Sequence, residues 1–95
     1  MAKQLYHYDI KITGRVQGVG YRYFTRKMAS DLDVRGRVRN EADGSVSIAA
    51  EGREDIVKHL IDLLKRGPTL SRVVDIKVNK YQIDDYKYPD FRVAY

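Results

Sequence analysis

The chain has 95 residues, enough for a single domain over residues 1–95 with one hydrophobic core. Its 18 Lys and Arg residues outnumber its 13 Asp and Glu residues, and the net charge of +5 favours anionic partners such as phosphates, acidic metabolites or nucleic acid. The absence of cysteine excludes disulfides, cysteine-based zinc sites and phosphocysteine intermediates. With neither a long apolar run nor a secretory signal in the sequence, we expect a soluble, cytoplasmic protein that does not bind membranes.

The first third of the chain predicts a strand followed by a helix. Apolar and polar residues alternate over residues 6–12, which is typical of a half-buried strand. A glycine-containing segment follows at residues 14–20. Apolar residues then recur at three- and four-residue steps over residues 21–32, the period of an amphipathic helix. The predicted helix therefore starts directly after the glycine-containing segment.

A β-hairpin is predicted next. Residues 34–39 alternate, residues 40–44 read Asn-Glu-Ala-Asp-Gly and supply turn chemistry, and residues 46–50 resume the alternation. Arg37 has the opposite parity to Asn40. In a regular strand these two side chains therefore point to opposite faces of the sheet.

The remaining elements are a second helix and two strands. A broad apolar stripe over residues 56–64 predicts a helix that ends at Gly67 and Pro68. Val74, Ile76 and Val78 indicate a fourth strand, and Phe91, Val93 and Tyr95 indicate a short fifth one.

This order of elements predicts an α+β fold. We expect a ferredoxin-like βαββαβ sandwich, in which two helices cover one face of an antiparallel sheet and a short fifth strand follows at the C-terminus. Because this topology hosts many unrelated functions, the function has to be argued from particular residues.

The segment from Arg15 to Arg22 carries the strongest chemical signal. Its glycines allow several main-chain N–H groups to point inward, and the segment opens a helix, whose N-terminus attracts anions. Arg22 is placed to add a bidentate, charge-assisted contact to the same anion. The Walker A and dinucleotide-binding glycine motifs do not fit. By composition alone, a tight turn without a ligand is an equally good interpretation.

Two motifs decide between these interpretations. Residues 12–22 read Ile-Thr-Gly-Arg-Val-Gln-Gly-Val-Gly-Tyr-Arg and strongly resemble the first motif of the acylphosphatase family. The second motif of that family matches at Gly36, Val38, Asn40, Gly44, Val46 and Gly52. Two positions depart from the family pattern: Tyr21 stands where Phe or Met is usual, and Arg37 where an aromatic residue is usual.

The resemblance implies a function and a set of site residues. It implies a metal-independent enzyme that hydrolyses small acyl phosphates to a carboxylate and inorganic phosphate, with no cofactor. Arg22 would bind the phosphoryl group and Asn40 would orient the attacking water. Main-chain N–H groups of the loop would complete the phosphate cradle, at Gln17, Gly18, Val19, Gly20 and Tyr21. We expect the protein to act as a monomer.

This chemistry needs few protein groups. The leaving carboxylate has a conjugate acid of pKa about 4, so it departs without a general acid at neutral pH. The phosphoryl oxygens can accept the proton of water while the protein supplies position and charge. An asparagine suits the water site because its amide both donates and accepts without adding a negative charge.

Other functions are also considered. A phosphate-recognising or regulatory module of the same fold would use the same loop without turnover. A basic row of arginines and lysines could bind RNA, but the strand at 45–50 lacks the aromatic residues that stack bases, so we do not expect nucleic-acid binding. That row consists of Arg35, Arg37, Arg39, Lys77 and Lys80.

Three further polar features are assigned structural roles. Asp31 and Asp33 resemble an aspartyl-phosphate box, but they close a helix, so capping and turn formation are favoured. His7 and His59 are isolated in the sequence and lack metal-ligand spacing, which favours surface or packing roles.

Overall fold

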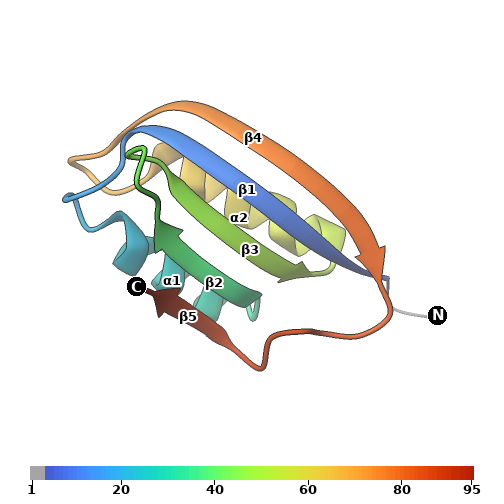
Figure 1. Cartoon of the computed structure of the whole chain (residues 1–95). Helices are drawn as coiled ribbons and strands as arrows, with labels where there is room; N and C mark the ends of the chain where they lie inside the picture. The colour runs from blue at the N-terminus through green and yellow to red at the C-terminus, as the bar shows by residue number, and fades with distance from the viewer. Residues whose placement is uncertain (1–3) are drawn as a thin grey trace.

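The computed structural model describes residues 4–95 and has two helices on one face of a five-stranded sheet (Figure 1). The elements are β1 (Leu5–Arg15), α1 (Tyr21–Asp31), β2 (Arg35–Asn40), β3 (Val46–Gly52), α2 (Glu54–Arg66), β4 (Arg72–Ile83) and β5 (Phe91–Ala94). The strands lie in the order β4-β1-β3-β2-β5. The predicted ferredoxin-like α+β fold is therefore confirmed.

The four long strands pair antiparallel, whereas β5 runs parallel to β2. The main-chain N–H of Gly36 donates to the carbonyl oxygen of Asp90 at 2.9 Å where this parallel pairing begins. As a result the chain returns along the outer edge of the sheet, and its C-terminal end lies beside α1 (Figure 1).

The hydrophobic core lies between the sheet and the two helices. Its sheet side is formed by the alternating apolar residues of the central strands, and its helix side by residues spaced three or four apart, as the periodicity predicts. Its largest members with less than 2% exposure include Tyr8, Ile12, Val38, Val46, Tyr21, Val57, Leu60 and Leu64. Each such side chain contributes about 1.5–3 kcal/mol through burial. Among residues 4–95, no helix is long and apolar enough to cross a membrane.

The edge strand β4 is longer than its apolar residues indicate. The sequence located it by Val74, Ile76 and Val78, but the strand covers 12 residues, of which the polar ones beyond Val78 also pair with β1. Only Ile76 of those three packs against the core, whereas Val74 is 72% and Val78 41% exposed.

A β-bulge explains why Val74 faces solvent. The pairing register with β4 shifts between Thr13 and Gly14, so that Val74 has no partner on β1 and Val73 packs against the core in its place. Gly14 has φ +131°, and a Cβ atom there would lie 2.1 Å from the carbonyl oxygen of Arg72. The bulge thus requires glycine at position 14.

Candidate active site

The loop of residues 16–20 connects β1 to α1 and contains two glycines in the left-handed region. Gly18 has φ +73° and Gly20 has φ +79°. A Cβ atom at either position would meet no other atom within 4 Å, so the conformation and not crowding favours glycine here. The surface above the loop is therefore open to a ligand.

The main chain of this loop offers hydrogen-bond donors. The first bond of α1 runs from the N–H of Phe24 to the carbonyl oxygen of Gly20 at 3.0 Å, and the N-cap Gly20 has no side chain to cap the helix. Within the described chain, no hydrogen bond is formed by the N–H groups of residues 17–23, and the first turn carries no acidic residue. Loop and helix start therefore present free donors and positive potential to an anion.

Arg22 and Asn40 line one hollow beside this loop. The hollow has a volume of about 430 Å³ and lies between the loop, the start of α1, the end of β2 and β5. Arg22 is half-buried in the first turn of α1, and its guanidinium carbon lies 5.1 Å from the centre of the Tyr95 ring. No carboxylate of the described chain pairs with Arg22. Its charge is therefore available to a ligand.

Asn40 is the last residue of β2 and directly precedes the β2–β3 turn. It has the same parity as the buried Val38, so its side chain faces the helix side of the sheet. Its Oδ1 atom is buried and has no hydrogen-bond partner among the described residues. An unpaired buried acceptor costs about 1–3 kcal/mol, and a ligand group that donates to Oδ1 would remove that cost.

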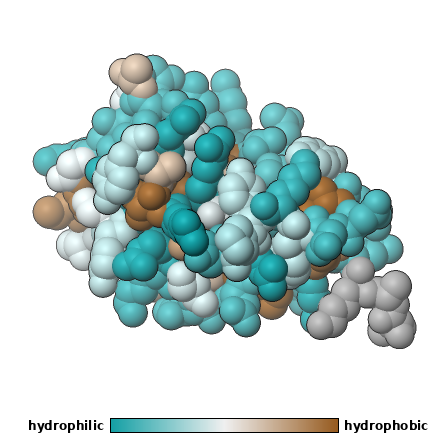
Figure 2. Space-filling model, turned by 60° about the horizontal axis from the view of Figure 1, so that its bottom comes forward, coloured by the Kyte–Doolittle hydropathy of each residue, from teal (hydrophilic) through white to brown (hydrophobic). Residues whose placement is uncertain are grey.

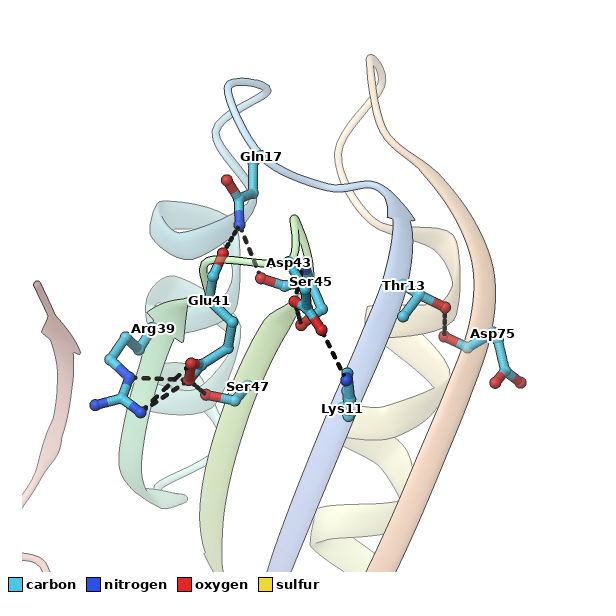
Figure 3. A network of polar contacts seen from close by, with 9 residues as sticks. All are labelled: Lys11, Thr13, Gln17, Arg39, Glu41, Asp43, Ser45, Ser47 and Asp75. Atoms are coloured by element: carbon cyan, nitrogen blue, oxygen red, sulfur yellow. Dashed lines mark hydrogen bonds and ion pairs between the residues drawn. The ribbon is translucent and has the colours of Figure 1, made fainter.

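Gln17 joins the loop to the β2–β3 turn. Its side-chain Nε2 donates to the main-chain carbonyl oxygens of Glu41 at 2.8 Å and Ser45 at 2.9 Å (Figure 3). The sequence predicted a role for the main chain of Gln17 and missed this contact of its side chain. The contact spans 28 residues between Gln17 and Ser45, so no local pattern reveals it.

The β2–β3 turn is held by a second set of polar contacts. Asp43 accepts from the N–H of Ser45 at 2.9 Å, from the Ser45 hydroxyl at 2.5 Å and from Lys11 at 2.9 Å (Figure 3). These hydrogen bonds, led by the Ser45 hydroxyl, hold the pKa of Asp43 far below its usual value. Glu41 accepts from Arg39 and Ser47, and these bonds lower the pKa of Glu41.

Tyr21 departs from the first motif, and its environment explains the substitution. Its side chain is 1% exposed and points into the core, where the hydroxyl donates to the carbonyl oxygen of Leu64 at 2.6 Å. Burial raises the pKa of Tyr21 well above its usual value. The hydroxyl thus satisfies a carbonyl near the end of α2 and lies away from the loop's free N–H groups.

Arg37, the second departure, lies on the other face of the sheet. It lines a separate hollow of about 400 Å³ on the open face, together with Asp9, Lys77 and Asn79 among others. The predicted opposite orientation of Arg37 and Asn40 is therefore confirmed. The central strands β1 and β3 present polar residues, Leu5 and Ala49 to this face and no aromatic residue except the buried His7 ring.

His7 is less isolated than its position in the sequence indicates. Its Nδ1 lies 2.7 Å from Glu51 and its Nε2 lies 3.0 Å from Asp9, and its ring stacks on Tyr81 at 5.0 Å between centroids. His7 is buried and packed, which is one of the two roles that the sequence favoured for it. His59 is exposed on α2. Within residues 4–95, no group of three His, Cys, Asp or Glu side chains is placed to hold a metal ion.

Similarity to known proteins identifies the family. The acylphosphatase family model matches residues 8–93. An acylphosphatase of Salinibacter ruber is 49% identical over 87% of this chain and 86% of its own. The chain belongs to the acylphosphatase family. An acylphosphatase of Archaeoglobus fulgidus is 42% identical over 92% of this chain and 96% of its own, so the relationship to these enzymes extends over both chains almost completely.

Solved acylphosphatase structures have the same arrangement. The crystal structure of acylphosphatase from Bacillus subtilis has a TM-score of 0.89 and 36% identity, and covers 95% of this chain and 99% of that one. Full-length HypF, in its phosphate- and nucleotide-bound form, has a TM-score of 0.88 and 30% identity over 99% of this chain but only 12% of its own. The acylphosphatase fold therefore occurs both alone and within a longer protein.

Proposed function

We propose that this acylphosphatase hydrolyses small acyl phosphates, that Arg22 binds the phosphoryl group, and that Asn40 positions the attacking water without the aid of a metal. One observation carries the proposal. Arg22 and Asn40 line the same hollow beside the loop; within the described chain the guanidinium of Arg22 makes no ion pair, the buried Oδ1 of Asn40 has no hydrogen-bond partner, and the loop's N–H groups are free.

The phosphoryl group would lie against the loop. Main-chain N–H groups of Gln17, Gly18, Val19, Gly20 and Tyr21 are proposed to donate to its oxygens, and the first turn of α1 adds positive potential. Arg22 would add charge-assisted hydrogen bonds from its planar guanidinium. These groups are fixed before substrate arrives, so they stabilise the charge of the transition state with little reorganisation.

The water would be held by the Asn40 amide. Oδ1 accepts a hydrogen bond from the water, and a phosphoryl oxygen takes the proton as the oxygen–phosphorus bond forms. The bond between phosphorus and the acyl oxygen breaks, and its electron pair leaves with the carboxylate. No Asp, Glu or His lines the hollow in the described chain, and none is required, because a carboxylate leaves unprotonated at neutral pH.

The test is hydrolysis of benzoyl phosphate by the purified protein in EDTA. Wild type should release inorganic phosphate, and Arg22→Gln and Asn40→Ala should each lose at least about a hundredfold in kcat/KM. Circular dichroism and urea unfolding check that both variants fold.

Two matched variants test whether removing any arginine or any asparagine from the sheet has the same effect. Arg37 and Asn79 both line the hollow on the opposite, open face of the sheet. Arg37→Gln and Asn79→Ala should keep wild-type kcat/KM at physiological ionic strength. Full activity in Arg22→Gln or Asn40→Ala would overturn the proposed roles.

A second candidate is a module that recognises phosphate without turnover. The match to HypF motivates this alternative, because the same fold there makes up only 12% of a longer protein. Calorimetry that detects phosphate binding by wild type and its loss in Arg22→Gln, with no turnover of benzoyl phosphate, would support the module and reject the enzyme.

A further inference from the structure

Part of the hollow takes no part in the proposed hydrolysis. Beyond Arg22 and Asn40, it is lined by Tyr23, Arg26 and Tyr95. Since the phosphoryl group would lie against the loop, these three side chains lie where the acyl end of the substrate would extend. Their chemistry should therefore decide which acyl groups fit.

Arg26 is placed one helical turn after Arg22 on α1. Residues four apart on a helix lie on the same face, with about 5–6 Å between their Cβ atoms. The guanidinium carbon of Arg26 lies 5.5 Å from the centre of the Tyr23 ring, a cation–π contact that limits its freedom. Within residues 4–95, Arg26 takes part in no ion pair.

Tyr95 gives Arg22 a similar support. Its ring lies 5.1 Å from the Arg22 guanidinium carbon, although the side chain is 97% exposed. Each arginine of the hollow thus lies beside a tyrosine ring. The two guanidinium groups are presented on one face of α1, and neither makes an ion pair within residues 4–95.

The charge of the hollow favours an anionic group at the acyl end. Among the described lining residues there are two arginines and no Asp or Glu. The face of the molecule seen in Figure 2 is mostly hydrophilic and has separate apolar areas. The rest of the lining is uncharged and partly apolar, with Val16 and Val93 among its members, so a second anionic group of the substrate would meet the guanidinium of Arg26, which has no ion pair among residues 4–95.

We propose that Arg26 is a specificity-determining residue that binds a second carboxylate at the far end of the acyl group, so that the site favours acyl phosphates of short dicarboxylic acids. This inference rests on the proposed function, with the phosphoryl group at Arg22. In an extended four-carbon dicarboxylic acyl phosphate, the phosphorus and the distal carboxylate carbon are about 6 Å apart, given bond lengths near 1.5 Å. That distance matches the spacing of one helical turn.

The test compares two acyl phosphates of the same shape. Fumaroyl phosphate ends in a carboxylate, crotonoyl phosphate ends in a methyl group, and the trans double bond of both prevents cyclisation. The readout is the ratio of kcat/KM for the two substrates, corrected for spontaneous hydrolysis. We expect wild type to favour fumaroyl phosphate by about threefold to tenfold, between the value of a strong exposed charge pair and that of a charge-assisted hydrogen bond.

Variants of adjacent residues separate a specific contact from general attraction. Arg26→Gln should bring the ratio close to one, and Arg26→Glu should invert it. Lys27→Gln removes the same charge from the next position of α1, where Lys27 is exposed, pairs with Asp31 at 4.0 Å and does not line the hollow. Lys27→Gln should keep the wild-type ratio at both low and physiological ionic strength.

The outcomes distinguish this inference from the function on which it rests. If wild type hydrolyses crotonoyl phosphate but shows no preference, or if Arg26→Gln keeps the wild-type ratio, the role of Arg26 is rejected and the hydrolytic function stands. An equal fall of the ratio in Lys27→Gln also rejects it. If wild type hydrolyses neither substrate, the proposed function fails and this inference fails with it.

Discussion

Gln17 and Ser45 are joined by a hydrogen bond of 2.9 Å from the side-chain amide of the first to the main-chain carbonyl oxygen of the second. The same nitrogen donates to the carbonyl oxygen of Glu41 at 2.8 Å. Through this one side chain, the loop before α1 is attached to the turn that follows Asn40. The N–H groups proposed to hold phosphate and the amide proposed to hold water are thereby fixed relative to each other.

Gln17→Glu tests this attachment without changing the size of the side chain. The carboxylate would place an acceptor against two carbonyl oxygens, so we expect stability to fall by roughly 1–3 kcal/mol. We expect kcat for benzoyl phosphate to fall at least about tenfold, because small displacements of reacting groups are costly. Gln17→Ala should have a smaller effect on both.

The split between kcat and KM identifies a positioning role. Gln17 would act through the loop and the turn, so kcat should fall by more than KM rises. Gln82→Glu is the matched control, since Gln82 is exposed on the edge strand β4. A Gln17→Glu variant with the kcat and stability of Gln82→Glu would show that the two hydrogen bonds do not matter.

Tyr21→Phe restores a residue usual in the family at the cost of a buried hydrogen bond. The change removes the hydroxyl that donates to the carbonyl oxygen of Leu64 and leaves that acceptor buried. We expect the free energy of unfolding in urea to fall by about 1–2 kcal/mol. Tyr23→Phe removes an exposed hydroxyl from the same helix and should change stability by less than about 0.5 kcal/mol. Equal stabilities of the two variants would contradict this explanation of Tyr21.

Local patterns were sufficient to predict most of the fold and the orientation of the main site residues. Alternation over residues 34–39 placed Val38 among the apolar positions of its strand, and the opposite parity of Arg37 and Asn40 placed their side chains on opposite faces of the sheet, as the structure has them. The helix that starts at Tyr21 was predicted from its period and from the glycines before it. These features depend on neighbouring residues, so they can be read from the sequence.

Features that depend on distant residues were missed. The bulge that exposes Val74 results from how β4 pairs with β1, and the contact between His7 and Glu51 joins residues 44 apart. The parallel pairing of β5 with β2 likewise follows from the return of the chain around the sheet. No periodicity encodes such pairings.

Asp43→Asn should lower stability at neutral pH and have less effect in acid. Hydrogen bonds from Ser45 and Lys11 hold the pKa of Asp43 below its usual 3.8 in the folded protein. Below that pH the unfolded chain binds a proton that the folded chain does not. The contribution of the Asp43 carboxylate to stability is therefore complete above pH 3.8 and is lost as the pH falls through the lower pKa of the folded protein. The lowered pKa of Glu41 contributes with the same sign.

Urea unfolding at a series of pH values measures this dependence. The difference in stability between wild type and Asp43→Asn should be largest near neutrality and should shrink toward about pH 2. Asp84→Asn is the control, because Asp84 is exposed and its carboxylate makes no hydrogen bond within the described chain. A difference for Asp43→Asn that does not change between neutral and acid pH would show that the carboxylate's charge is not involved.

Glu51→Ala should be the most destabilising of these substitutions. The Glu51 side chain is fully buried; one oxygen lies 2.7 Å from His7 Nδ1, and the other accepts from the N–H groups of Lys87 at 2.7 Å and Tyr88 at 3.3 Å. Removing it leaves the buried His7 ring and the part-buried N–H groups of Lys87 and Tyr88 without their partner, so we expect a loss of about 3–5 kcal/mol in urea. Glu51→Gln should lose less stability, because one of its terminal atoms can still accept a hydrogen bond.

Glu54→Gln is the control: it removes only a half-exposed pair with Lys80 and should cost at most about 1 kcal/mol. Faster amide exchange at Lys87 in Glu51→Gln would locate the loss of stability in the segment that leads to β5. A Glu51→Ala variant as stable as Glu54→Gln would refute the stabilising role of Glu51.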